Sequence, residues 1–215
     1  MANLKEIRNR ISSVGSTMQI TSAMKMVSAA KLKKAQDAIT AMRPYSEKLT
    51  ELLQNLSATL GSDTGGVYSE QREVNNVLVV AISSNRGLAG AFNSNIVKQA
   101  KELAGVTYAD KKVDFFTIGK KGNDILSRTG NVAENNNAIF DHLSFEATAE
   151  IAERLMELYA NGSYDRIVVV YNNFKNAATQ FVLTEQFLPI LPPKASETTS
   201  AADYIFEPNK VEIVE

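Results

Sequence analysis

The residues whose types and spacing best suit chemistry lie in one turn that follows the apolar stretch 77–82. Residues 83–93 read Ser-Ser-Asn-Arg-Gly-Leu-Ala-Gly-Ala-Phe-Asn. Between a strand and a helix of an open α/β sheet, such a turn can place nucleotide phosphates at the helix N-terminus. The dinucleotide pattern needs G-x-G-x-x-G, and this turn contains only Gly87 and Gly90 in a G-x-x-G spacing. It is therefore a weak nucleotide signal.

A second turn, Gly119-Lys120-Lys121-Gly122, follows residues 113–118, which are expected as a strand. It offers no acidic residue for a ribose hydroxyl and does not match a phosphate loop that ends in Gly-Lys-Ser/Thr. Three interpretations of residues 83–93 stay open. The segment is a nucleotide site, a tight turn that needs small residues, or a contact with a partner through Arg86.

The other reactive residue types are sparse. His142 is the only histidine, and no nucleophile or further metal ligand accompanies it between Asp141 and Leu143. The chain has no cysteine, and no pair of carboxylates follows a general acid–base motif. We expect no catalytic residue, no cofactor and no metal site.

An apolar heptad repeat fills the first sixty residues. Of its 17 positions 13 are apolar, which predicts a coiled-coil helix of roughly 85 Å. A stripe of that length needs a partner to cover it. The positions are Leu4, Ile7, Ile11, Val14, Met18, Thr21, Lys25, Ser28, Leu32, Ala35, Ile39, Met42, Ser46, Leu49, Leu53, Leu56 and Leu60.

The repeat weakens between residues 21 and 28, where its positions are Thr21, Lys25 and Ser28. Apolar side chains there move partly to another face, which indicates a contact besides the coiled-coil partner. Methionine suits such a contact because its side chain repacks easily. The displaced apolar residues are Ile20, Ala23, Met24, Met26 and Val27.

Charge is distributed unevenly along the chain. The total is −1, but residues 1–34 carry +6 and the remainder −7, so a basic arm precedes an acidic body. This favours an acidic partner surface for the arm. Nucleic acid is disfavoured because no aromatic residue precedes Tyr45. The charged e and g positions are all positive, which favours a heterologous or intramolecular partner helix over self-pairing; they are Arg8, Arg10, Lys31 and Arg43.

Strands and helices alternate after residue 74, which predicts a Rossmann-like α/β domain with a mixed, mostly parallel sheet behind the long N-terminal coiled-coil helix. We expect strands at 77–82, 113–118, 138–140, 166–171 and 179–188, the last antiparallel after a tight turn at 172–176. Helices are expected at 92–103, 123–127 and 145–160, with a loop at 129–137. The expected organisation is a helix 1–60, a linker 61–73, an α/β domain 74–190 and an extended tail 191–215.

No apolar run reaches the ~20 residues of a membrane span and no signal peptide opens the chain, so we expect a soluble protein that reaches a membrane through partners.

Five motifs, in order along the chain, resemble those of the gamma subunit of the F-type ATP synthase. They are Leu4–Val14, Ile20–Val27, Ala29–Leu32, Arg43–Tyr45 and Asn85–Asn93. The resemblance covers essentially the whole chain. It implies a non-catalytic central-stalk subunit whose rotation couples proton translocation to ATP synthesis and hydrolysis. The resemblance also implies that this subunit regulates ATPase activity and proton flow.

The resemblance also implies partners. In the family the shaft lies inside the hexamer of alpha and beta subunits, and the α/β domain lies near the epsilon subunit and the c-ring, on the cytoplasmic face of the bacterial membrane. Met24, Lys25 and Met26 are implied to bear on beta, and the turn with Arg86 to face an acidic region of beta. The expected partner contacts are Arg8, Arg10, Ile20, Met24, Lys25, Met26, Val27, Lys31, Lys33, Arg86, Gly87 and Leu88.

Relatives carry a further C-terminal helix, and we expect this chain, which ends at Glu215, to lack it. Two other functions remain as alternatives to the stalk subunit. One is a nucleotide-binding enzyme of Rossmann type, and the other is a coiled-coil adaptor unrelated to the synthase.

Overall fold

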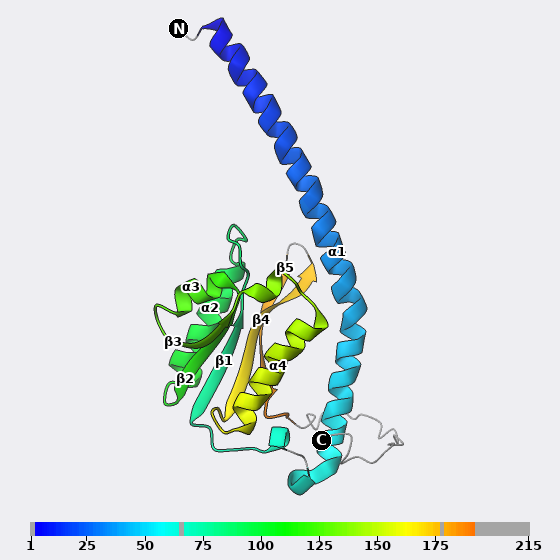
Figure 1. The fold of residues 1–215 in the computed structure, drawn as a ribbon, viewed down its shortest axis with the longest axis vertical. Helices are drawn as coiled ribbons and strands as arrows, with labels where there is room; N and C mark the ends of the chain where they lie inside the picture. Colours follow the sequence, from blue (N-terminus) through cyan, green and yellow to red (C-terminus); the bar gives the residue numbers. More distant parts are fainter. Residues whose placement is uncertain (1–2, 65–66, 177–178, 192–215) are drawn as a thin grey trace. The chain divides into compact units, whose positions relative to one another are not determined.

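A computed structural model describes residues 3–64, 67–176 and 179–191, and side chains in the first of these ranges up to residue 53. The chain divides into two compact units, Met1–Leu53 and Gln54–Glu215. The expected tail lies almost wholly outside the described residues. Figure 1 shows the elements of both units.

The helix α1 spans Leu4–Thr64 and contains 61 residues. The heptad repeat predicted this helix, and the structure confirms a long N-terminal helix. Pro44 lies inside α1 without ending it. Thr17 and Thr21 donate their hydroxyls to the carbonyl oxygens of Ser13 and Thr17, four residues back, at 2.9 and 2.8 Å. Their polar groups are therefore satisfied by the helix itself.

The second unit contains a five-stranded sheet in the order β3-β2-β1-β4-β5. The first four strands in this order pair in parallel with their neighbours, and β4 pairs antiparallel with β5. This confirms the mixed, mostly parallel sheet. The central strand β1 is apolar throughout its middle because both of its faces are covered. The strands are β1 (Asn76–Ile82), β2 (Lys112–Ile118), β3 (Asn131–Asn136), β4 (Arg166–Asn176) and β5 (Thr179–Leu188).

Helices cover both faces of this sheet (Figure 1). Val77, Val79 and Ala81 of β1 pack with α2 (Phe92–Glu102) and α3 (Lys120–Leu126). The alternate residues Leu78 and Val80 pack with α4 (Phe145–Ala160) on the other face. Successive side chains of a strand point to opposite faces, so one apolar strand supports two cores. Short turns of helix complete the unit: η1 (Val67–Ser69), η2 (Leu103–Thr107) and η3 (Ala138–Phe140).

Three local expectations are wrong. Residues 131–136, expected as loop, form the edge strand β3, since Asn131 donates to Asp114 of β2 at 2.7 Å and Val132 packs into the core. Residues 138–140 form the helical turn η3 instead of a strand. Residues 172–176 continue β4, because their pairing with β5 persists to Asn176 opposite Thr179. The N-cap at Ser144 is confirmed, since its hydroxyl oxygen accepts from the amide of Ala147.

A buried phenol gives the second unit a dependence on alkaline pH. Tyr164 donates its hydroxyl to Oδ2 of Asp114 at 3.0 Å. Burial, and next the hydrogen bond to Asp114, raise the pKa of Tyr164 to about 12, from 10.0 for a free tyrosine. The folded state therefore holds this proton over a pH range in which the unfolded state releases it.

We expect the free energy of unfolding to fall between pH 10 and 12 in part through Tyr164. The contribution is fully present below pH 10 and is lost as the pH rises through the folded-state pKa. Tyr164→Phe should be less stable than wild type at pH 8. Above pH 10 its free energy of unfolding should fall less steeply with pH, by a slope that corresponds to at most one proton per molecule. Urea unfolding at pH 8, 10 and 11.5 measures both. Equal losses in the two proteins would contradict this assignment.

Candidate partner-binding surfaces

The apolar stripe of α1 is exposed along the described part of the helix. Its large apolar side chains have exposed fractions between 39% and 69%. The unit Met1–Leu53 contains one helix only among its described residues, so this unit has no second element to cover the stripe. A stripe of this length is typical of an interaction surface. The side chains are Leu4, Ile7, Ile11, Val14, Met18, Leu32, Ile39, Met42, Leu49 and Leu53.

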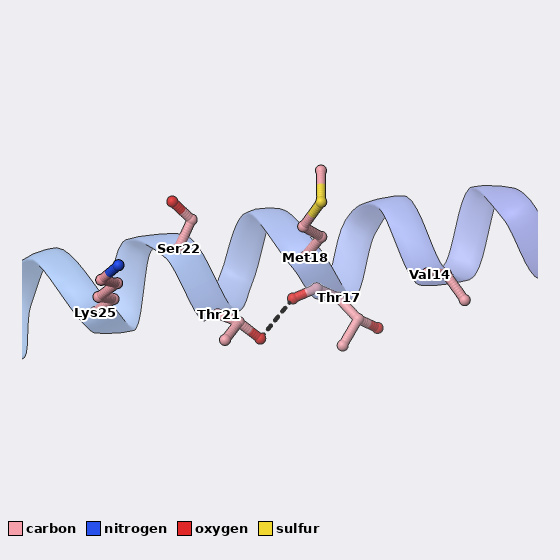
Figure 2. Close-up of a pocket in the computed structure, with 6 residues that line it drawn as sticks. All are labelled: Val14, Thr17, Met18, Thr21, Ser22 and Lys25. Carbon is pink, nitrogen blue, oxygen red and sulfur yellow. Dashed lines mark hydrogen bonds between the residues drawn. The ribbon is translucent and has the colours of Figure 1, made fainter.

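A shallow depression interrupts the stripe, and Figure 2 shows the side chains that line it. Small residues, Thr21 and Ser22, separate Met18 from Lys25 there. Because the hydroxyl of Thr21 bonds to its own helix, it needs no partner in an apolar interface. The weak positions of the repeat therefore form a hollow that a partner side chain can enter. The depression is lined by Val14, Thr17, Met18, Thr21, Ser22 and Lys25.

A second apolar stripe lies on another side of α1. Ile20, Met24 and Val27 follow the spacing i, i+4, i+7, and Lys31 extends it by one turn. At ~100° per residue, this stripe lies roughly 120° around the helix from the heptad positions. The apolar members are exposed by 57% to 65%, and Met26, on a third side, by 66%. This part of α1 can contact two partners at once.

The expected basic contacts of α1 also face solvent: Arg8, Arg10, Lys25, Lys31 and Lys33 are all exposed. Among the described residues no ion pair joins any of these five side chains to an acid. The five cations are therefore available to carboxylates of a partner.

The turn between β1 and α2 is closed by its own polar groups. The amide of Ser84 donates to Oδ1 of Asn93 at 2.9 Å, and the hydroxyl of Ser84 donates to the carbonyl oxygen of Arg86 at 2.7 Å. Asn85 accepts from the amide of Lys120 at 2.9 Å and donates to the carbonyl oxygen of Asn137 at 2.8 Å. The amide and hydroxyl of Ser84 and the side-chain amide of Asn85 thus donate within the turn and to its neighbour. The geometry favours the tight-turn and partner-contact interpretations over a nucleotide site.

Gly119 lets the ends of β1 and β2 meet. Its φ is +103°, and a Cβ there would lie 2.3 Å from the carbonyl oxygen of Ser83. The hydroxyl of Ser83 in turn accepts from the amide of Gly122 at 2.8 Å. The backbones of Ser83 and Gly119 are thus in close contact at the ends of β1 and β2. This contact fixes the position of the turn between β1 and α2.

The tip of this turn presents a strained apolar residue to solvent. Leu88 has a φ of 60°, a region that costs a residue with a Cβ roughly 1–2 kcal/mol, and its side chain is fully exposed. Such strain is typical of functional loops. Arg86 and Gly87 beside it are also exposed. The residues expected as contacts in this turn are therefore brought together on one surface.

The sequence did not single out the residues that hold this surface. Asn85 and Asn93 fix the turn, and Gly119 permits the contact below it. A signal existed for the asparagines, because asparagine next to a strand end often satisfies backbone groups of a turn. No group of three or more His, Cys, Asp or Glu among the described residues is arranged to hold a metal ion. Within those same ranges, no helix is long and apolar enough to cross a membrane.

These surfaces present apolar and cationic side chains for contact. The described residues contain one long helix followed by an α/β domain. Together with these surfaces, this architecture is typical of a structural subunit of a larger assembly.

A family model described as ATP synthase matches residues 3–215. The chain is 69% identical over 214 residues to the ATP synthase gamma chain of Flavobacterium johnsoniae, and 67% identical to that of Flavobacterium psychrophilum. Each alignment covers 100% of this chain and 74% of the relative. The chain belongs to the ATP synthase gamma chain family.

Solved structures agree with this assignment. A chain of the central stalk and c-ring of the Tetrahymena thermophila mitochondrial ATP synthase is similar, with a TM-score of 0.63 and 27% identity. The alignment covers 79% of this chain and 72% of that one. Gamma chains are non-catalytic subunits of the central stalk, and the catalytic sites lie on beta. The chain thus serves ATP synthesis as part of a rotary motor.

Proposed function

We propose that this chain transmits torque through the two stripes of α1. We also propose that the turn with Arg86 provides a further contact with a partner. The heptad stripe takes a partner helix. The stripe Ile20–Met24–Val27 and Lys31 contact the alpha and beta subunits, and so does Lys25, at the point where the heptad stripe is interrupted. The observation that carries the proposal is the exposure of two apolar stripes on different sides of one helix. A shaft that touches a second helix and a surrounding ring needs two such surfaces.

The remaining partners follow from the same proposal. The helix α1 (Leu4–Thr64) is the shaft, and the residues between it and residue 74 join it to the α/β domain 74–190. The α/β domain meets the epsilon subunit and the c-ring. The complex is then held at the cytoplasmic face of a bacterial membrane as a peripheral assembly. The c-ring named with the Tetrahymena central stalk supports the proposed contact with a c-ring.

Lys25 tests the contact with the hexamer. It is exposed on a helix whose first half is basic, so an acidic partner surface is favoured. We expect Lys25→Glu to lower proton-driven ATP synthesis at least several-fold in membrane vesicles, because a like charge replaces an attractive pair. The thermal stability of the gamma chain should not change, since the side chain is exposed.

Lys25→Arg is the matched control, because it keeps the charge at the same position and should retain synthesis. ATP hydrolysis and proton pumping, measured on the same vesicles, show whether coupling or assembly has changed. Normal synthesis by the Lys25→Glu complex would contradict the proposed contact.

A further inference from the structure

The segment between α1 and β1 is fastened to the α/β domain at both ends and in its middle. The helix α1 ends at Thr64 and β1 begins at Asn76, and residues 67–75 between them, here called the strap, are described. The carbonyl oxygen of Tyr68 accepts from the amide of Ile190, which follows β5, at 2.9 Å. Tyr68 also packs against the core that contains α4. The first end of the strap is therefore held by the domain.

The other end of the strap is held by the loop between α4 and β4. Oδ2 of Asp165 accepts from the amides of Asn75 and Asn76, at 2.9 and 2.7 Å. The amide of Asp165 donates in return to the carbonyl oxygen of Asn76 at 2.9 Å. One carboxylate thus satisfies two backbone donors where the strap meets β1. The strap enters the sheet from a fixed position.

Arg72 fastens the middle of the strap to the end of α4. Its Nη1 donates to the carbonyl oxygen of Tyr159 at 2.9 Å, and its Cζ lies 4.8 Å from the centroid of the Tyr159 ring. Tyr159 belongs to the last turn of α4, where carbonyl oxygens lack partners within the helix and a cation is favoured. The hydroxyl of Tyr159 donates back to the carbonyl oxygen of Glu70 at 2.5 Å, and the Glu70 carboxylate pairs with Arg72 at 3.0 Å.

The two sides of this contact differ in burial. Tyr159 is fully buried in the core under α4, whereas the side chain of Arg72 is 23% exposed. The tyrosine therefore provides a fixed anchor, and the arginine closes over it from the strap. Because Arg72 lies outside the core, its replacement removes the fastening without opening a cavity among the buried side chains.

Without these contacts the strap would be a free tether. Residues 65–75 would then separate α1 from β1, and such a tether can extend to roughly 40 Å. With the strap fastened, only two residues lie between the end of α1 and the strap, and they span roughly 10 Å at most. A tether transmits rotation only after it is drawn taut, so the fastening removes most of the slack.

We propose that the strap carries torque between the α/β domain and α1, with Arg72 as the positioning residue that fastens it to Tyr159. The inference rests on the proposed function, in which α1 is a shaft that transmits torque. The anchor is the end of a core helix, so a rotation of the α/β domain moves the strap with it. The rotation then reaches α1 with little lag.

The torsional stiffness of the rotor tests this role. The full gamma chain is assembled with cysteine-free alpha and beta subunits that are fixed to a surface. A bead is attached through Thr129→Cys, exposed in the α/β domain of a chain without other cysteines. A non-hydrolysable ATP analogue stops rotation, and the thermal angular variance of the bead is recorded. We expect Arg72→Ala to raise this variance about twofold or more, because a loosened tether adds its own spread to that of the helix.

Arg154→Ala is the matched control. Arg154 also lies on the α/β domain and loses two ion pairs, with Glu134 and Glu157, but neither partner belongs to the strap. The control should leave the variance unchanged. Arg72→Lys keeps a cation for the Tyr159 ring and should give a smaller rise than Arg72→Ala. Urea unfolding of each variant separates a loss of stability from a loss of stiffness.

A second variant covers the case in which Arg72→Ala does not assemble. Tyr159→Phe keeps the ring and removes only the hydrogen bond to Glu70, so it should raise the variance by a smaller factor. Equal variances for Arg72→Ala and Arg154→Ala, or a wild-type variance for Tyr159→Phe in that case, would overturn the torque-bearing strap while leaving the shaft intact. A wild-type complex whose bead does not rotate when ATP is added would instead overturn the proposed function.

Discussion

Replacement of Ile11 and Met18 by aspartate is expected to abolish assembly of the gamma chain with alpha and beta subunits. Both side chains belong to the heptad stripe and are 67% and 69% exposed on the helix. A partner that buries them contributes about 1.5–3 kcal/mol for each side chain. Loss of that burial alone weakens association more than a hundredfold, and a carboxylate in an apolar interface adds a further cost.

The control for this variant lies on the other side of α1. Asn9→Asp/Ser16→Asp adds the same two carboxylates seven residues apart, at f positions of the repeat. Co-purification of tagged gamma with alpha and beta is the measurement. The aspartates lie in the unit Met1–Leu53, so the α/β unit should keep its circular dichroism spectrum. Recovery of the Ile11/Met18 variant at the level of the control would contradict a covered stripe.

Gly119→Ala is expected to destabilise the α/β unit by about 3 kcal/mol or more. The φ of +103° strains any residue with a Cβ, and the new methyl would lie 2.3 Å from the carbonyl oxygen of Ser83. The atom it meets is backbone, so relief requires β1 and β2 to separate at their ends. This would also release the hydrogen bond from the amide of Lys120 to Asn85 that positions the turn.

Gly105→Ala provides the comparison within the same unit. A Cβ at Gly105 meets no atom within 4 Å, so this variant should be within about 1 kcal/mol of wild type. Urea unfolding of the full chain, followed by circular dichroism, measures both. Equal midpoints for the two variants would show that the strand ends do not meet as described.

The parts of the fold with a strong hydrophobic pattern were predictable. The heptad repeat predicted α1, and the continuous apolar stretch 77–82 predicted β1. The strand β3 was not, because its Asn-rich sequence has low strand propensity and it depends on hydrogen bonds from neighbours distant in sequence. The same limit applies to the sites. The sequence indicated Arg86 as a candidate contact from its own turn, and the structure shows that this residue is exposed.

The closeness of Lys120 to that turn depends on the pairing of β1 with β2, which local sequence does not encode. The strain at Leu88 likewise has no local signal, since leucine rarely adopts a positive φ. The second stripe of α1 was visible only as a weakening of the repeat, because none of its members lies at an a or d position of the heptads.

The central claim, that the stripe of α1 is covered by partners in the working complex, is tested most directly by cysteine labelling. The chain contains no cysteine, so Met18→Cys provides a single probe on the stripe. Thr129→Cys, exposed in the α/β unit, is the reference. The maleimide labelling rate of gamma in the assembled complex, divided by its rate in denaturant, should be at least tenfold lower for Met18→Cys than for Thr129→Cys. Equal ratios would mean that the stripe stays open to water, which would contradict the account.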